Sequence, residues 1–263
     1  MASLLLLNPN TSAEVSALLH REEIARCPPA VTLRVVNARF GPRYITGEIG
    51  AAIAGHAALD AYAEAVDEGE EPDAVLLACF GDPGLLALRA LSAAPVLGLA
   101  EAAMQRAAAH GPFVIVTGGA AWAPILERLA VSLALPAPLL GVQCVQRSGG
   151  ELAGAADAVP VLAQAAREAL ARWPKACAVL LGGAGLAGLA EPVAARVPAP
   201  VIDNVHAALD AAFALASDAA ARAETAQRAW PAAQLALERG PWTGLGATLT
   251  HLLTSAGDNA RAS

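Results

Sequence analysis

The sequence predicts an α/β fold built from two similar halves, each with its own parallel sheet. Short apolar runs alternate with longer Ala/Leu-rich stretches along the 263 residues, which is the pattern of strand–helix–strand units. The runs are hydrophobic at nearly every position, as expected for parallel strands that are buried on both faces. The pattern of the first part of the chain also recurs in the second part, which indicates an internal duplication.

Eight apolar runs are expected to form the strands, because each is short and most end in turn-forming residues ahead of a helical stretch. Hydrophobic residues make up 56% of the chain and charged residues only 16%, so enough apolar surface is present for a large buried core. The predicted strands are Ser3–Leu7, Val31–Val36, Ala74–Ala78, Val96–Leu99, Pro112–Val116, Leu139–Val145, Ala178–Leu181 and Val201–Ile202.

The duplication is clearest in two pairs of segments. Ala74–Leu85 (AVLLACFGDPGL) matches Ala178–Leu189 (AVLLGGAGLAGL), and Ala94–Leu97 (APVL) matches Ala199–Ile202 (APVI). The simpler explanation is that runs of Ala, Val and Leu look alike by chance. Ordered matches at a nearly constant separation favour two copies of one unit.

Four predicted strand ends carry polar residues or glycines that suit a ligand. In open α/β sheets, ligands bind beyond the carboxyl ends of the strands. If the two halves face each other, Cys79 and Gly183 lie on opposite sides of one cleft, which is the predicted active site. The four strand ends are Asn8–Ser12, Cys79–Gly84, Thr117–Gly119 and Gly182–Gly185.

Cys79 is the candidate catalytic residue. A free thiol has a pKa near 8.5, so a modest lowering gives a useful thiolate at neutral pH. Asp82 is a suitable N-cap and Pro83 a suitable first residue for the next helix, whose N-terminus would lower the pKa of the thiol. The alternative is a buried structural cysteine, which is the commonest fate of a free thiol.

Other residues at these strand ends are expected to bind the substrate. Backbone N–H groups next to glycine can approach an oxyanion closely, and Asn or Thr side chains can donate further hydrogen bonds. The alternative for these side chains is a purely local role as turn and helix caps. His206 is included because the duplication matches it with Glu101. The candidate substrate-binding residues are Asn8, Asn10, Phe80, Gly81, Thr117, Gly118, Gly119, Ala184, Gly185 and His206.

The composition argues against several other classes of protein. A net charge of −7 and an aromatic content of 4% do not suit a nucleic-acid partner. The longest apolar run, Ala176–Ala190, is Gly-rich and too short to span a bilayer. The four cysteines show no CxxC spacing, so neither a disulfide framework nor a metal site is expected. We therefore expect an acidic cytoplasmic enzyme that acts on a small molecule.

Four segments resemble the aspartate/glutamate/hydantoin racemase superfamily, above all its hydantoin and allantoin racemase branch. They occur in the family's order and spread over nearly the whole chain to about residue 215, and the segment around Cys79 is the most specific. The segments are Leu7–Ser12 (LNPNTS), Ala78–Leu85 (ACFGDPGL), Gly98–Met104 (GLAEAAM) and Leu181–Leu186 (LGGAGL), with Pro200–Asp203 (PVID) behind the last.

The resemblance implies two flavodoxin-like halves with the active site between them. One half would hold residues 1–98 and 204–263, and the other residues 99–203. The family uses no metal and no organic cofactor, and it places one cysteine of each half on either face of the substrate's α-carbon. The resemblance further implies a homo-oligomer and places Thr46 near the substrate-contact region.

The sequence departs from the family at the second cysteine, where Gly183 stands, either naturally or as an engineered change. Cys177 lies at the start of the same strand, about 20 Å from its carboxyl end, so it cannot substitute. Three functions stay open at this point. They are a racemase or epimerase of a hydantoin-like or amino-acid-derived substrate, a one-thiol carbanion enzyme such as an arylmalonate-type decarboxylase or other lyase, and a non-catalytic ligand-binding homologue.

Overall fold

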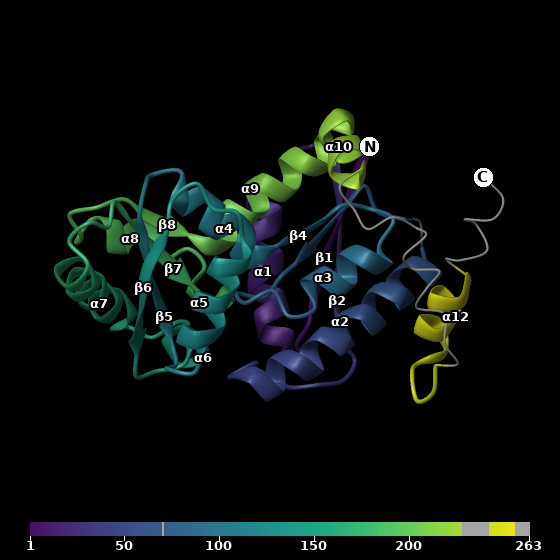
Figure 1. Ribbon diagram of the computed structural model, residues 1–263, viewed down its shortest axis with the longest axis horizontal. Coiled ribbons are helices and arrows are strands. Elements are labelled where there is room, and N and C mark those ends of the chain that lie inside the picture. Colours follow the sequence, from purple (N-terminus) through teal and green to yellow (C-terminus); the bar gives the residue numbers. More distant parts are fainter. Residues whose placement is uncertain (70, 228–241, 256–263) are drawn as a thin grey trace.

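Two four-stranded parallel sheets form the centre of the molecule, which a computed structural model describes over residues 1–69, 71–227 and 242–255. The strand order is β2-β1-β3-β4 in one sheet and β6-β5-β7-β8 in the other, so the two sheets have the same topology. Figure 1 shows them side by side. The strands are β1 (Ala2–Asn8), β2 (Val31–Asn37), β3 (Ala74–Leu77), β4 (Val96–Gly98), β5 (Phe113–Gly118), β6 (Leu139–Val145), β7 (Ala178–Gly182) and β8 (Val201–Asp203).

The strands predicted from the sequence are all found in the described part of the chain, with ends that differ by no more than two residues. The inner strands β1, β3, β5 and β7 are buried along most or all of their length. Helices cover both faces of these inner strands, which explains why their sequences are hydrophobic at nearly every position instead of alternating. The shared strand order gives structural support to the duplication seen in the sequence.

Helices connect successive strands and pack on the sheets. No helix within the described residues is both long enough and apolar enough to cross a membrane. The helices are α1 (Ala13–Arg26), α2 (Glu48–Asp67), α3 (Leu85–Leu91), α4 (Leu99–Ala108), α5 (Trp122–Ser132), α6 (Gly149–Leu152), α7 (Ala158–Arg172), η1 (Ala184–Leu186), α8 (Ala190–Ala194), α9 (Asn204–Ser217), α10 (Ala219–Gln227) and α12 (Ala247–Ser255).

Two helices cross between the halves. Helix α4 leaves the first sheet at β4 and packs against α9 and β7, whereas α9 leaves the second sheet at β8 and packs against α4, β1 and β3. Figure 1 shows α9 running from the end of β8 toward the N-terminus of the chain. One hydrophobic core therefore includes Leu76 of the first sheet and Leu180 of the second, together with Ala103 of α4 and Ala212 of α9.

The predicted division of the chain into 1–98 plus 204–263 and 99–203 stays a prediction. The two sheets fall on either side of these boundaries, since their strands lie within residues 2–98 and 113–203. The packing of α9 on β1 and β3 supports the return of the chain to the first half after residue 203. Part of the predicted return, residues 228–241 and 256–263, lies outside the described residues.

Asn204 offers a test of the core between the crossing helices. Its side chain is fully buried at the start of α9, and neither its Oδ1 nor its Nδ2 has a hydrogen-bond partner among the described residues. A buried amide without partners costs about 1–3 kcal/mol. Leu99, which holds the matching place at the start of α4, is also fully buried.

We expect Asn204→Leu to raise the thermal unfolding midpoint, by about 2–4 °C for each kcal/mol gained in a chain of this size. The matched variant Leu99→Asn should lower the midpoint, because it buries a new amide. Both changes are measured by calorimetry or circular dichroism. Loss of stability in Asn204→Leu would show that the amide is bonded in solution.

Candidate active site

Cys79 lies just beyond the carboxyl end of β3, in the loop that leads to α3. The N–H of Ala78 donates to the carbonyl of Leu7 in the neighbouring strand (2.8 Å), which fixes the backbone directly before the thiol. The Cys79 side chain packs in a small apolar cluster with Ile45 and Ala54, and only 7% of the residue is exposed. The predicted position at a strand end is present, whereas the catalytic role stays a prediction.

The predicted lowering of the pKa of the Cys79 thiol is wrong for this structure. Burial in the apolar cluster raises this pKa well above its ordinary value, and the charge of Asp82 raises it further. The helix that was expected to lower it begins only at Leu85, after Gly84 in the left-handed conformation (φ 79°). The thiol is therefore neutral at pH 7 in this arrangement.

Asp82 does not cap the helix that follows it, contrary to the prediction. Its backbone has a left-handed φ of 48°, and its buried carboxylate accepts hydrogen bonds from the N–H groups of Ala100 (2.9 Å) and Glu101 (2.8 Å) at the start of α4. Burial raises the pKa of this carboxyl to about 7, although the two N–H donors act in the opposite direction. Asp82 thus joins the Cys79 loop to a crossing helix.

The Cys79 loop meets the carboxyl end of β7. The ring of Phe80 lies directly over Gly182, where an added Cβ would fall 2.1 Å from a ring carbon. Gly183 follows with a φ of 125°, and the nearest neighbour of a Cβ added there is Cγ of Leu186, at 3.9 Å. Position 183 therefore has room for a side chain, but its backbone conformation favours glycine.

The other candidates of the second half lie at the carboxyl end of β5 and in the loops after β5 and β7, close to the loop after β6. Thr117 Oγ1 donates to the carbonyl of Gly182 (2.8 Å), so this hydroxyl supports the backbone next to position 183. Gly118 and Gly185 both lie against residues 147–149, and a Cβ added to either would fall under 3 Å from that backbone. These glycines permit a close approach of three loops. The same loops contain Gly119 and Ala184.

Comparison with known proteins identifies this arrangement. The family model described as Asp/Glu/Hydantoin racemase matches residues 4–212, a span that includes both loops and all of both sheets except the first two residues of β1. The chain belongs to this family.

Relatives of known structure or name agree with this assignment. A hydantoin racemase of Paenarthrobacter aurescens is 30% identical over 227 residues, which cover 81% of this chain and 90% of that protein. An allantoin racemase of Klebsiella pneumoniae is 28% identical with a TM-score of 0.70, covering 82% of this chain and 88% of that one. For an allantoin racemase of Pseudomonas fluorescens the identity is 26%, the TM-score 0.72 and the coverage 82% and 91%. The predicted fold class and family are confirmed.

The first-half candidates of this racemase-family protein have local partners. Asn8 Nδ2 donates to Asn10 Oδ1 (3.2 Å) and to Ser16 Oγ (2.7 Å). Asn10 Oδ1 also accepts from the N–H of Ser12 (2.8 Å), the N-cap of α1. Thr46 is exposed in the loop before α2. The turn and cap roles of the two Asn residues are therefore present, and contact of these three residues with a ligand stays a prediction.

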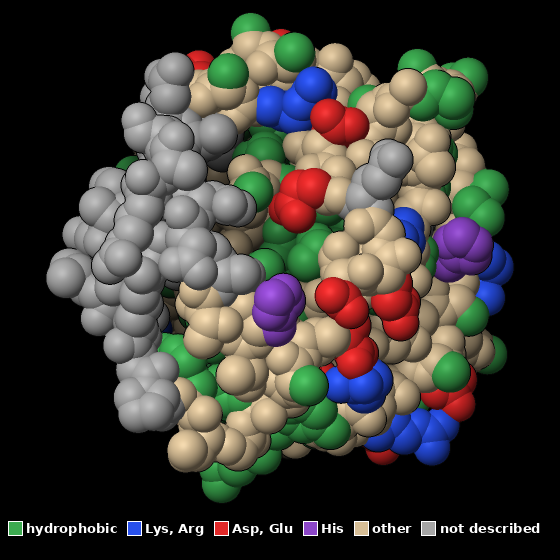
Figure 2. Space-filling view, turned by 90° about the vertical axis from the view of Figure 1, so that its right-hand side faces the viewer, with side chains coloured by type: hydrophobic (Ala, Val, Ile, Leu, Met, Phe, Trp, Pro, Cys, Tyr) green, Lys and Arg blue, Asp and Glu red, His purple; other side chains and the backbone are tan. Residues whose placement is uncertain are grey.

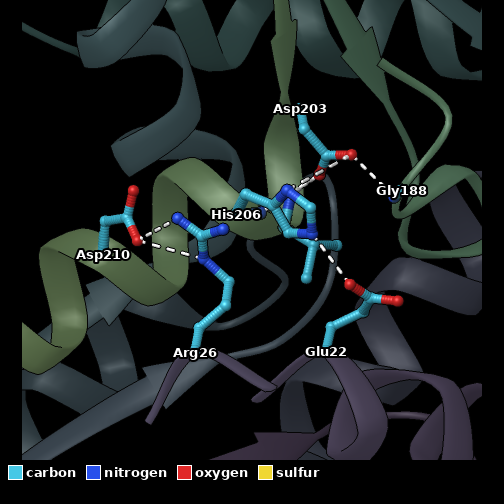
Figure 3. Close-up of polar contacts among 7 residues, drawn as sticks. Glu22, Arg26, Gly188, Asp203, His206 and Asp210 are labelled. Atoms are coloured by element: carbon cyan, nitrogen blue, oxygen red, sulfur yellow. Dashed lines mark hydrogen bonds and ion pairs between the residues drawn. The ribbon is translucent and has the colours of Figure 1, made fainter. Parts of the chain in front are cut away.

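His206 lies in the first turn of α9 and points toward α1 (Figure 3). Its Nε2 is 2.8 Å from Oε2 of Glu22, and its Nδ1 is 4.0 Å from Oδ2 of Asp203. Arg26 and Asp210 form a second ion pair between the same two helices (2.6 Å). The contacts of His206 thus tie a crossing helix to the first half, and a role in binding substrate stays a prediction.

Sequence reasoning missed two side chains that close over the Cys79 loop. Trp122, the first residue of α5, comes from the second half, packs on the Cys79 cluster and covers Gly81, where an added Cβ would fall 2.5 Å from its ring. Ile45 belongs to the same cluster. Trp122 is one of only four tryptophans and follows a predicted ligand-binding turn, which was a usable signal.

Two hollows of the molecule lie away from Cys79 and Gly183. One of about 490 Å³ follows α5 and β6, and one of about 710 Å³ lies between β6 and α7, but neither is lined by Cys79 or Gly183. On the face seen in Figure 2, acidic and basic side chains are interspersed. Within the described residues, no three His, Cys, Asp or Glu side chains are grouped to hold a metal ion. Neither hollow coincides with the predicted active site around Cys79 and Gly183.

The buried Asp82 predicts a pH dependence of stability. Because folding raises its pKa from an ordinary 3.8 to about 7, the folded state holds this proton more tightly than the unfolded state. The stabilising contribution is full below about pH 4 and is lost as the pH rises through about 7. We expect the free energy of unfolding to fall more steeply with pH in the parent than in Asp82→Asn.

Urea denaturation at intervals between about pH 4 and pH 8 measures this difference. The exposed Asp67 at the end of α2 supplies the matched control, and Asp67→Asn should keep the slope of the parent. Parallel slopes for the parent and Asp82→Asn would contradict the raised pKa.

Proposed function

We propose that this protein is a cofactor-independent racemase or epimerase that removes the proton α to a carbonyl of a hydantoin-like or amino-acid-derived substrate, with the Cys79 thiolate as base. The observation that carries the proposal is the place of Cys79. In a chain of the racemase family, it stands beyond an inner strand, in the loop that contacts the carboxyl end of β7 through Phe80. The named activities of the relatives, hydantoin and allantoin racemisation, support a cyclic ureide as substrate.

In the proposed reaction, the thiolate of Cys79 takes the α-proton and becomes a thiol, while the electron pair of the C–H bond moves into an enolate. We assign the backbone N–H groups of Phe80 and Gly81, and of Ala184 and Gly185 in the second half, to the oxygens that gain charge. A proton delivered to the opposite face then gives the other enantiomer. Since the enclosed thiol is neutral, its ionisation has to accompany the entry of a polar substrate.

Gly183 favours a second candidate function of the same chemical class. Position 183 carries no side chain, so the opposite face lacks the acid that a two-base racemase needs, and solvent has to supply that proton. A one-thiol reaction needs no such acid. In a decarboxylation, carbon dioxide would leave from one face and Cys79 would deliver a proton to the resulting carbanion. A ligand-binding protein without catalysis is the remaining alternative.

Deuterium exchange separates these functions. The protein is incubated in heavy water with single enantiomers of 5-substituted hydantoins, allantoin and free amino acids, and both deuterium uptake and optical rotation are followed. We expect uptake with inversion for at least one cyclic ureide. Cys79→Ser should slow the exchange by about 10²–10⁴-fold, the range for loss of a general base.

The exposed Cys177 supplies the matched control, because Cys177→Ser removes a thiol at the far end of β7 and should leave exchange unchanged. Deuterium exchange with retention of configuration would support one-base chemistry in place of racemisation. Absence of exchange with all of these compounds would overturn the racemase proposal, and loss of carbon dioxide from an arylmalonate would then support the lyase.

Restoring a second thiol gives a further test. Gly183→Cys adds a thiol where the nearest neighbour of an added Cβ is Leu186 Cγ at 3.9 Å, at a backbone cost of about 1–3 kcal/mol because of the φ of 125°. On the proposed function, this thiol faces Cys79 across the substrate. Gly183→Ser has the same cost but adds no comparable base. We expect racemisation of a substrate that the parent exchanges to be faster in Gly183→Cys than in Gly183→Ser. Equal rates in two folded variants would count against a base position at residue 183.

A further inference from the structure

The Cys79 loop and helix α4 are joined by one carboxylate. The N–H of Asp82 donates to the carbonyl of Cys79 (3.1 Å), so the aspartate closes the turn that carries the thiol. Both oxygens of its side chain accept from α4, one from Ala100 N–H and one from Glu101 N–H. These are free donors of a helix first turn, which need an acceptor when they are buried. The thiol turn and the crossing helix are therefore held as one unit.

The second half has the same joint, made from a different position. Asp203 Oδ1 accepts from the N–H groups of Val205 (3.0 Å) and His206 (3.1 Å) in the first turn of α9. Its Oδ2 accepts from the N–H of Gly188 (2.7 Å), in the loop after β7 (Figure 3). In each half, one carboxylate thus joins the loop of the third strand to the first turn of the helix that crosses over.

The two carboxylates occupy equivalent places in the two halves, although they come from different positions of the repeated sequence. In the duplication, Asp203 matches Gly98, the residue directly before α4. A Cβ added to Gly98 would lie 2.3 Å from Oδ2 of Asp82, so the side chain of Asp82 fills the space of an aspartate at position 98. Gly98 itself has an ordinary extended backbone (φ −87°, ψ 142°) that any residue can adopt. It lacks a side chain because Asp82 stands there.

We propose that Asp82 is a positioning residue for Cys79. It fixes the turn that carries the thiol on α4 and sets a negative charge beside the thiol. A carboxylate at position 98 can replace Asp82 in both roles. The meaning of this joint for catalysis rests on the proposed function. The joint itself and its effect on the thiol are measurable without a substrate.

Three charged side chains lie around this joint. Asp82 raises the pKa of Cys79 by its charge, in addition to the effect of burial. Glu101 faces Asp82 from α4 and Arg89 faces it from α3, and these two form an ion pair of 2.5 Å with each other. Because Glu101 and Arg89 oppose each other, removal of the Asp82 charge changes the local field at the thiol most directly.

A four-member set of variants tests the exchange of positions. The set contains the parent, Asp82→Gly, Gly98→Asp and the double variant, and the measurement is the thermal unfolding midpoint. Glycine suits the left-handed backbone at position 82. We expect each single change to lower the midpoint, the first by loss of the cap and the second by collision of two carboxyl groups. The double variant should recover to near the parent.

The proton affinity of the thiol is measured in the same proteins. Alkylation of Cys79 by iodoacetamide is followed by peptide mass spectrometry as a function of pH, with the exposed Cys177 as the internal control. Asp82→Asn, which tolerates the left-handed backbone, should move the Cys79 profile to lower pH and raise the alkylation rate of Cys79 at a fixed pH. The double variant, with its carboxylate restored, should move back toward the parent.

Two results would overturn the proposal. One is an additive set, in which Gly98→Asp lowers the unfolding midpoint as much in the Asp82→Gly background as in the parent. The other is a Cys79 profile that does not move in Asp82→Asn. Should Asp82→Gly fail to fold, the double variant decides the same question, because Gly98→Asp should restore folding and a double variant that also fails to fold would overturn the proposal. Both measurements can be made without a racemase substrate, so failure of this proposal is distinguishable from failure of the proposed function.

Discussion

A helix that leaves one sheet to cover another has to bury its first turn, and the free N–H groups of that turn need an acceptor. Helices α4 and α9 are both in this position, and each turn is satisfied by one buried carboxylate, from Asp82 and Asp203. Asp82 belongs to the loop after β3, and Asp203 accepts from Gly188 in the loop after β7. Capping each crossing helix therefore also positions one of these loops. The contact of Phe80 with Gly182 then brings the Cys79 loop to the carboxyl end of β7, where the second loop begins.

The same burial that orders the site raises the pKa values of its two acidic groups. At Asp82 the loss of solvation outweighs two N–H donors, and at Cys79 burial acts in the same direction as the neighbouring carboxyl. Both groups therefore favour their neutral forms more than they would in water. A thiol in this state is unreactive toward solvent and oxidants, which act on the thiolate. On the proposed function, reactivity then depends on a substrate that rearranges the polar surroundings of the sulfur.

The elements that the sequence predicted correctly are those set by local pattern. Eight strands were predictable because buried parallel strands are hydrophobic at every position, and the duplication was predictable because both halves keep the same turns. Asp82 was assigned to α3, whereas it caps α4. The N-cap rule considers only the residues that follow in the sequence, and it does not foresee the left-handed φ of 48° at Asp82. The contacts of His206 with Glu22, and of Trp122 with Gly81, join distant parts of the chain, and no local rule specifies them.

On the proposed function, Gly183 stands where a second reactive group is expected, in a loop whose contacts do not depend on a side chain at that position. The loop after β7 is held by Asp203 through Gly188 and by Thr117 through Gly182, and none of these contacts involves a side chain at position 183. On the proposed function, a planar enolate would meet a thiol on one face and open space on the other. The stereochemical outcome is then decided by whether water reaches the face at position 183, and not by the strength of the base at Cys79.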